Sequence, residues 1–177
     1  MIFIDRISSP ADRQWNVSPV GLVRSTYTEK YGTSKQATIS REIAIVQLFP
    51  GYEECLLGLD GFDYVWVITL LHLDKGHKNK ILTRPKGGKD GERVGLFASR
   101  APHRPNPVGL SALHLLEVDV KKGSLIVEGI DYLQNTPVLD IKPYIPAFDA
   151  FPNARAGWMD VISEDVMKSR EEGYQEF

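Results

Sequence analysis

Two guanidinium groups, an imidazole and an amide are concentrated in one proline-rich stretch, residues 99–107 (SRAPHRPNP). Its three prolines fix φ and favour extended backbone at the preceding residues, so the stretch has little conformational entropy to lose when a ligand binds. Guanidinium groups on a rigid backbone suit an anion, because each can donate two parallel hydrogen bonds to a carboxylate or phosphate. A surface turn whose arginines pair with nearby carboxylates is an equally common use of these residue types. The residues concerned are Arg100, His103, Arg104 and Asn106.

Positive charge is concentrated in the segment that contains this stretch. Residues 75–104 hold nine Lys or Arg against two acids, a charge of +7, so the rest of the chain carries −9 within a total of −2. A basic segment on a mildly acidic protein is typical of binding to a polyanion such as RNA. A solvated surface loop is the common alternative for a run of charges.

Well-known motifs of other chemistries are absent from the chain. There is no G-x-G-x-x-G after a predicted strand, no Walker A motif, no G-x-S-x-G elbow and no Cys/His spacing typical of zinc. We therefore predict no metal site. The single cysteine, Cys55, permits no internal disulfide and favours a reducing cytoplasm. We expect its thiol to be buried in a short helix, without a catalytic role.

Apolar patterns predict mostly β-strands, which must position these side chains. Strands are expected over residues 19–25, 42–49, 64–72, 96–98, 110–120, 124–130 and 138–142, with short helices at 52–57 and from Ser163. The run 64–72 is apolar almost throughout and predicts a strand buried on both faces. Because long helices between strands are missing, the pattern argues against a doubly wound sheet. It favours a mainly β, single compact barrel-like domain with short helices, not a Rossmann fold.

The 177 residues suit one domain that is large enough for a hydrophobic core. We expect an N-terminal extension over residues 1–16, the domain itself over 17–160, and a C-terminal helix or tail over 161–177. No apolar run is long enough to cross a bilayer, and the start of the chain lacks a signal-peptide layout. These features predict a cytoplasmic protein with no membrane association.

Four motifs, in order, resemble those of one known family. They are PVGLVRSTYTEKYG, GLDGFDYVWVITLLH, SRAPHRPNPVGLS and TPVLDIKPYIP, within residues 19–152. Together they are similar to the TsaA-like (YaeB) family. The resemblance implies a β-barrel fold and S-adenosylmethionine bound without a Rossmann fold, in a pocket completed by the second subunit of a homodimer. It also implies methylation of the exocyclic nitrogen of threonylcarbamoyladenosine beside the anticodon of tRNA.

The resemblance carries a set of site residues onto this chain. A guanidinium such as Arg100 suits the cofactor's carboxylate, backbone groups of residues 133–136 suit the edge of its adenine, and Leu110 suits the adenine face. The expected cofactor contacts are Ser34, Lys35, Gln36, His72, Leu73, Arg100, Leu110, Leu133, Gln134, Asn135 and Thr136. The expected RNA contacts are Arg84, Lys86, Arg104, Asn106, Lys142 and Tyr144.

The catalytic base is less clear from the sequence. His72 and Asp140 are candidates for taking the proton of the acceptor nitrogen, since a urea-like nitrogen is a poor nucleophile. A satisfied histidine at the rim of the core is an equally good interpretation of His72. For Asp140, Lys142 and Tyr144 the alternative is structural, with a buried Asp–Lys pair that holds the loop.

The chain departs from the family pattern at two places in the expected pocket. Gln134 and Asn135 replace an aspartate and a glycine, although asparagine tolerates a positive φ. Lys35 replaces an arginine, and the additional C-terminal domain of longer members has no counterpart here. The leading hypothesis is an S-adenosylmethionine-dependent tRNA methyltransferase. The alternatives are a non-catalytic S-adenosylmethionine-binding module with a regulatory role, and a methyltransferase with a small-molecule acceptor.

Overall fold

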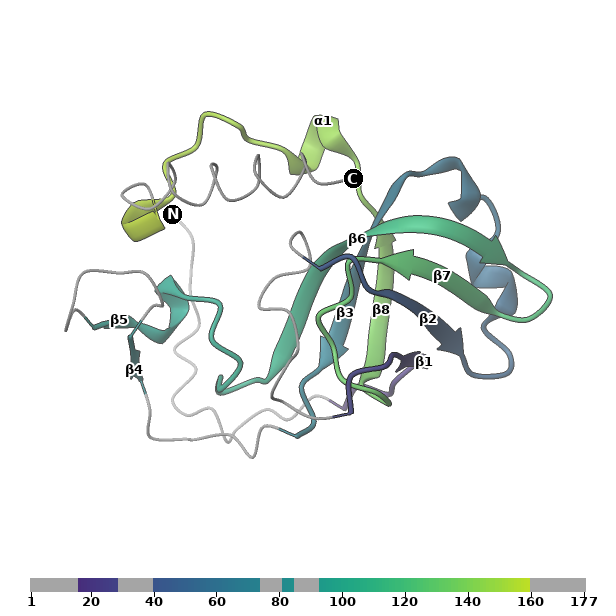
Figure 1. Cartoon of the computed structure of the whole chain (residues 1–177), viewed down its shortest axis with the longest axis horizontal. Coiled ribbons are helices and arrows are strands. Elements are labelled where there is room, and N and C mark those ends of the chain that lie inside the picture. The colour runs from purple at the N-terminus through teal and green to yellow at the C-terminus, as the bar shows by residue number, and fades with distance from the viewer. Residues whose placement is uncertain (1–15, 29–39, 74–80, 85–92, 160–177) are drawn as a thin grey trace, which may run out of the picture.

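Six antiparallel strands close into a barrel in the order β1-β2-β7-β6-β3-β8 (Figure 1). The computed structural model describes residues 16–28, 40–73, 81–84 and 93–159. The barrel strands are β1 (Gly21–Arg24), β2 (Ile43–Leu48), β3 (Tyr64–Leu70), β6 (Val108–Asp119), β7 (Ser124–Glu128) and β8 (Pro137–Pro143). The mainly β, barrel-like fold predicted from the sequence is confirmed.

The core lies inside the barrel, because apolar and outward-facing residues alternate along each strand. Val46, Val67 and Leu125 are among the side chains that are fully enclosed. On β3 this alternation corrects the prediction of a strand buried on both faces: Val65 and Val67 are buried, whereas Tyr64 is exposed. A single closed barrel has an outer surface, so only one face of each strand can be enclosed.

Two further local predictions are wrong. Residues 96–98 form a 3-10 helix, η4 (Leu96–Ala98), rather than a strand. The adjacent strand β5 (Val94–Gly95) pairs only with β4 (Leu82–Thr83), and the Ser99 hydroxyl donates to the Leu96 carbonyl at 2.9 Å, which closes a turn. Cys55 does lie in a short 3-10 helix, η2 (Glu53–Leu56), but it is exposed, since only Leu56 of that helix enters the core.

Three connections leave the barrel at the same end. They join β1 to β2 (residues 25–42), β3 to β6 (71–107) and β7 to β8 (129–136). The pairing shows this directly: Ile43, which starts β2, lies opposite Glu128, which ends β7, and Leu70 lies opposite Val108. All the segments expected to form the cofactor pocket belong to these connections or to the adjoining start of β6. Barrel closure therefore brings motifs distant in sequence to one end.

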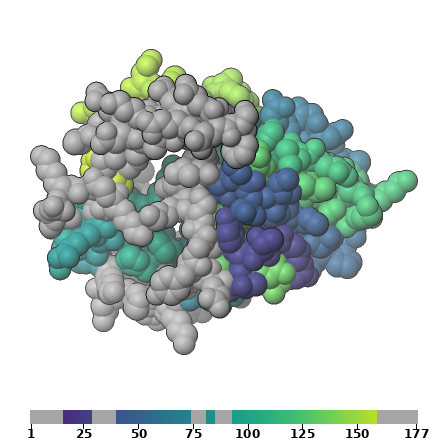
Figure 2. Space-filling view, in the orientation of Figure 1, coloured from purple at the N-terminus to yellow at the C-terminus, as the bar shows by residue number. Residues whose placement is uncertain are grey.

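Other short elements lie beside the barrel. The two-stranded sheet β4–β5 stands apart from it, and the chain after β8 runs back toward this sheet through α1 (Pro146–Asp149) and η5 (Gly157–Met159) (Figures 1 and 2). Trp158 Nε1 donates to the Ala98 carbonyl at 2.8 Å, which joins this returning segment to η4. Another 3-10 helix, η3 (Leu59–Gly61), follows η2. In the described part of the chain, no helix has the length and apolar character needed to cross a membrane.

The expected helix from Ser163 lies outside the described residues. The domain boundaries at residues 17 and 160 stay predictions.

Candidate functional site

An open groove of about 890 Å³ runs along the outer side of β3 and β6. Its walls come from the proline-rich loop, the outward face of β6, the aromatic residues at the start of β3 and after β8, and the segment that follows β7. The side chains used below are Trp66, Arg100, Leu110, Asp131, Tyr132 and Tyr144. A volume of this size is typical of ligand sites in proteins.

The proline-rich loop is braced by one of its own arginines. Arg104 Nη1 donates to the Ser99 carbonyl at 2.8 Å, and the guanidinium lies over the Phe97 ring, 5.6 Å from its centroid. The backbone N–H of Leu71 donates to the Pro107 carbonyl at 2.7 Å, which ties the loop to the end of β3. Arg104 thus supports the loop, and its contact with RNA stays a prediction.

Arg100 differs from Arg104 in having no local partner. Its side chain is exposed and lines the groove. Among the residues that the structure describes, no carboxylate or carbonyl pairs with its guanidinium. Both the ligand role of Arg100 and the alternative of a surface ion pair therefore stay predictions. A guanidinium held on a braced, proline-rich backbone is available for a carboxylate or phosphate ligand.

Three aromatic side chains form one wall of the groove. The Trp66 and Tyr144 ring centroids lie 5.4 Å apart, and those of Tyr64 and Tyr144 lie 6.2 Å apart. Asp149 Oδ2 accepts hydrogen bonds from Trp66 Nε1 at 3.1 Å and from the Ile145 backbone at 2.8 Å, which fixes the indole. Such rings present faces on which a planar group can stack. Of these three residues, only Tyr144 was expected from the sequence.

The floor of the groove is formed where β6 passes close to β3. A Cβ on Gly109 would collide with Thr69 Oγ1 and lie 3.0 Å from Tyr132 Cε1, so only glycine allows this approach. Ser111 Oγ donates to Asp131 Oδ1 at 2.9 Å. Burial, and then the charge of Asp131, raise the pKa of Tyr132 to about 12. Asp131 was not predicted from the sequence. The one local signal is that its carboxylate stands between Ile130 and Tyr132, two large residues that prove to be buried.

The turn at residues 133–136 is held by hydrogen bonds to β1 and the chain that follows it. Asn135 has a φ of 63°, so asparagine does occupy the left-handed conformation expected at the position of the family's glycine. Its side-chain oxygen accepts from Arg24 Nη1, and Gln134 Oε1 accepts from the Ser25 backbone at 2.7 Å. These two side chains brace the turn, which explains how it tolerates the departure from the family pattern.

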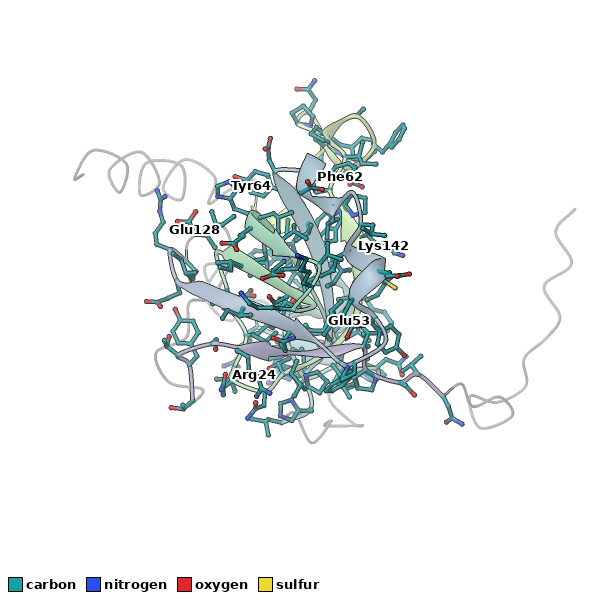
Figure 3. The ribbon with its side chains drawn as sticks, turned by 90° about the vertical axis from the view of Figure 1, so that its right-hand side faces the viewer. Arg24, Glu53, Phe62, Tyr64, Glu128 and Lys142 are labelled. Carbon is teal, nitrogen blue, oxygen red and sulfur yellow. The ribbon has the colours of Figure 1, made fainter. Side chains whose placement is uncertain are left out.

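The backbone donors of this turn are already used. The N–H groups of Gln134, Asn135 and Thr136 donate to the carbonyls of Tyr27, Val23 and Leu133, at 2.7, 2.8 and 3.1 Å. The carbonyl oxygens of the turn are therefore better suited than these three N–H groups to contact a ligand. Figure 3 shows Arg24 and Tyr64 toward opposite ends of the barrel, so the turn and the aromatic wall lie apart.

Several predicted site residues do not line the groove. His72 and Leu73 are exposed beyond β3, and Leu71 lines the groove instead. Asp140 Oδ2 pairs with Lys142 Nζ at 2.7 Å, but the side chains are 45% and 61% exposed, which corrects the expectation of a buried pair. The pair lies on the exposed side of β8. Asp140 lines a separate cavity of about 390 Å³ beside η2 and η3.

The remaining candidates are exposed or fall outside the description. Arg84 and Asn106 are exposed, and neither lines the groove. Ser34, Lys35, Gln36 and Lys86 lie outside the described residues. In the described ranges, no group of three or more His, Cys, Asp or Glu side chains is arranged to hold a metal ion.

Comparison with known proteins identifies the family. Residues 22–150 match the family model described as the tRNA-methyltransferase O N-terminal domain. The chain belongs to the tRNA-methyltransferase O family. The resemblance predicted from the four motifs is confirmed. A crystal structure of the family, TrmO from Pseudomonas aeruginosa, superposes with a TM-score of 0.68 at 35% identity, over 82% of this chain and 62% of that one.

Two sequence relatives illustrate the range of the family. A Pyrococcus abyssi protein named "Probable S-adenosyl-L-methionine-binding protein" is 34% identical over 157 residues, which are 88% of this chain and 82% of that protein. The human protein named tRNA (adenine(37)-N6)-methyltransferase is 36% identical over 140 residues, 76% of this chain and 31% of that protein. The chain thus spans most of one relative and about a third of the other.

Proposed function

We propose that this protein is an S-adenosylmethionine-dependent methyltransferase that acts on tRNA at the adenosine beside the anticodon. The observation that carries the proposal is the groove, where the exposed Arg100 guanidinium and a wall of aromatic rings open into one space. Family membership supports the same reaction, since relatives are named for S-adenosylmethionine binding and for methylation of adenine 37 at N6.

The residues present fit the cofactor. Arg100 would bind its carboxylate, and Leu110, which is 56% exposed on the outer face of β6, would pack against its adenine. The 133–136 turn does not line the groove, but its carbonyl oxygens suit the exocyclic amino group of adenine, which is a donor, better than its N–H groups do. S-adenosylmethionine supplies an activated methyl group. The protein therefore has mainly to align the acceptor, which proximity and orientation achieve.

The aromatic wall suits the RNA. Bases in an anticodon loop are unpaired, and unpaired bases stack on aromatic side chains with about 1–3 kcal/mol per base. Trp66 and Tyr144 would hold the acceptor nucleoside or its neighbour in this way. We propose threonylcarbamoyladenosine as the acceptor, as the family motifs imply. We also propose that a homodimer is the working form, because the motifs imply a pocket that a second subunit completes.

Titration calorimetry with S-adenosylmethionine tests the cofactor assignment. We expect Arg100→Ala to weaken binding about 10- to 100-fold, the range for losing a hydrogen-bonded charge pair of about 1.5–3 kcal/mol. Arg155→Ala is the matched control, because Arg155 is exposed and does not line the groove. Wild-type protein that did not bind S-adenosylmethionine, even with tRNA present, would contradict the proposal.

Methylation assays then test the acceptor. Purified tRNA with and without the threonylcarbamoyl group is incubated with S-adenosylmethionine, and methyladenosine is measured by mass spectrometry of nucleosides. We expect transfer only to the threonylcarbamoylated tRNA. Equal transfer to both tRNAs would contradict the proposed acceptor and would indicate a tRNA methyltransferase of different specificity.

A regulatory S-adenosylmethionine-binding module is the second candidate. It is favoured by the use of Gln134 inside the fold, where its oxygen accepts from Ser25, and by the name of the Pyrococcus relative. This candidate predicts the same loss of binding in Arg100→Ala but no methyl transfer to any tRNA or small acceptor.

A further inference from the structure

Asp131 lines the groove together with residues that we propose to bind the cofactor and residues that we propose to bind the RNA. It follows β7, lines the groove together with Arg100 and Tyr144, and accepts a hydrogen bond from Ser111 at 2.9 Å. Its neighbours along the chain, Ile130 and Tyr132, are buried in the core at 0% and 6% exposure. The carboxylate is therefore held on anchored backbone while it faces the ligand space.

Among the described residues that line the groove, the other acid–base groups have identified structural roles or remain protonated. Asp149 Oδ2 already accepts two hydrogen bonds, from Trp66 and from the Ile145 backbone. The pKa of Tyr132 is raised to about 12, so its phenol stays protonated at neutral pH. Arginine cannot act as a base in a protein. Among the described residues that line the groove there is no histidine, and His72 and Asp140 lie outside it.

We propose that Asp131 is the general base of the methyl transfer, an inference that rests on the proposed function. The acceptor nitrogen lies between a purine ring and a carbonyl group, which both withdraw its lone pair and leave it a poor nucleophile. As this nitrogen bonds to the methyl carbon, its proton passes to the Asp131 carboxylate. The carbon–sulfur bond breaks with its electron pair kept on sulfur, and the protonated carboxyl group then returns the proton to solvent.

Ser111 has the role of a positioning residue. Its hydroxyl donates to Asp131 Oδ1, and a carboxylate has enough lone pairs to accept this hydrogen bond and a proton as well. Ser111 is 7% exposed on a strand that cannot shift, because Gly109 is packed against Thr69 and Tyr132. The hydrogen bond thus holds the Asp131 carboxylate against β6 at the wall of the groove.

The test compares Asp131→Asn with wild-type protein. Asparagine keeps an oxygen that can accept from Ser111 but cannot take a proton. We expect single-turnover methyl transfer to tRNA to fall about 10²- to 10⁴-fold, the usual contribution of a general base. The dissociation constants for S-adenosylhomocysteine and for tRNA, measured by titration, are expected to stay within about twofold of wild type. Asp131→Glu should restore part of the rate.

Ser111→Ala is the second variant, and its expected effect is smaller. It should lower the rate roughly tenfold without changing either dissociation constant, since the carboxylate remains but is less well oriented. Thermal melting of each variant checks that the barrel is intact.

Three outcomes would overturn the inference. A rate unchanged in Asp131→Asn would show that no base is needed at this position. Loss of S-adenosylhomocysteine binding would make Asp131 a cofactor contact, and loss of tRNA binding would make it an RNA contact. Failure of the proposed function is seen separately, in the wild-type arm. Wild-type protein that binds S-adenosylmethionine and methylates no tRNA would overturn both.

Discussion

Tyr132, at the floor of the groove, is buried beside the charged Asp131. This surrounding has a measurable effect on how stability depends on pH. Its pKa is raised to about 12, chiefly by burial and then by the charge of Asp131, above the usual value of about 10 for tyrosine. Between these two values the unfolded chain has already lost the phenolic proton, whereas the native state keeps it. The unfolded state then binds fewer protons, so the free energy of unfolding falls as pH rises from about 10 to about 12.

The expected loss from Tyr132 is about 3 kcal/mol over that pH range, at about 1.4 kcal/mol per pKa unit. Urea unfolding at pH 9 and pH 11.5 measures most of it, about 2 kcal/mol. In Tyr132→Phe this part of the alkaline destabilisation should be absent, so the variant should lose less stability than wild type between the two pH values. Equal losses in the two proteins would show that the phenol is not protected from ionisation in the native state.

Short elements, rather than long ones, shape the site. The proline-rich loop is braced through Arg104 and Ser99, and the 133–136 turn through Gln134 and Asn135. Both elements use polar side chains to hold backbone, which leaves the neighbouring Arg100 and Asp131 to face the groove. We expect a substitution at such a bracing residue to change the stability of the loop or turn more than it changes the rate of the reaction.

Substitutions of Asn135 measure how the conformation of the 133–136 turn affects stability. Its φ of 63° is strained for residues with a Cβ, more for alanine than for asparagine. Asn135→Ala and Asn135→Gly both remove the contact with Arg24, so their difference isolates the backbone conformation. We expect the alanine variant to be less stable than the glycine variant by about 1 kcal/mol. Denaturant unfolding of the pair checks this, and equal stabilities would contradict a strained turn.

At the scale of the whole molecule, the uneven distribution of charge bears on RNA binding. The net charge is only −2, so attraction to RNA must come from the +7 segment at residues 75–104. We expect reversal of Lys78, Lys80 and Lys86 to weaken tRNA binding. The salt dependence of binding should fall by roughly two to three units of slope on logarithmic axes.

The control for that experiment reverses three charges elsewhere, at Lys121, Lys122 and Arg155. The two lysines lie at the opposite end of the barrel from the three clustered connections, in the β6–β7 hairpin. Filter-binding or fluorescence titrations at several salt concentrations compare the two variants. If both lost the same affinity, general charge rather than the basic segment would account for RNA binding.

The outer surface also bears on oligomeric state. Phe97, Phe148 and Phe151 are 80%, 73% and 75% exposed, which is costly for a protein that works as a single copy. All three lie on the elements beside the barrel, near the groove. We expect light scattering at micromolar concentration to give about twice the monomer mass of 19.9 kDa.

Substitution tests the same surface. Phe148→Asp together with Phe151→Asp should give a monomer, whereas Leu57→Asp, at an exposed position beside η2, should leave the mass unchanged. A monomeric wild type at tens of micromolar would contradict the homodimer.

The sequence by itself determined the class of the fold and the position of most strands. Alternation of apolar residues is a local pattern, and it is the same whether or not the strand's partners are known. The motifs likewise identified the family. Of the site residues that they implied, Arg100 and Leu110 line the groove, and their ligand roles stay predictions. The apolar pattern gave a wrong prediction at residues 96–98. A closed barrel has no open edge at which this stretch could pair as a strand.

Only the tertiary structure decided which side chains share the groove. Leu71 lines it and His72 does not, and Asp131 rather than Asp140 faces its floor. The Asp140–Lys142 pair lies on the outer surface, although its sequence context resembles a buried one. These outcomes depend on the closure and register of six strands, which set side by side partners as distant in sequence as Gly21 and Val138. No local pattern contains that information, because it arises only when distant strands pair.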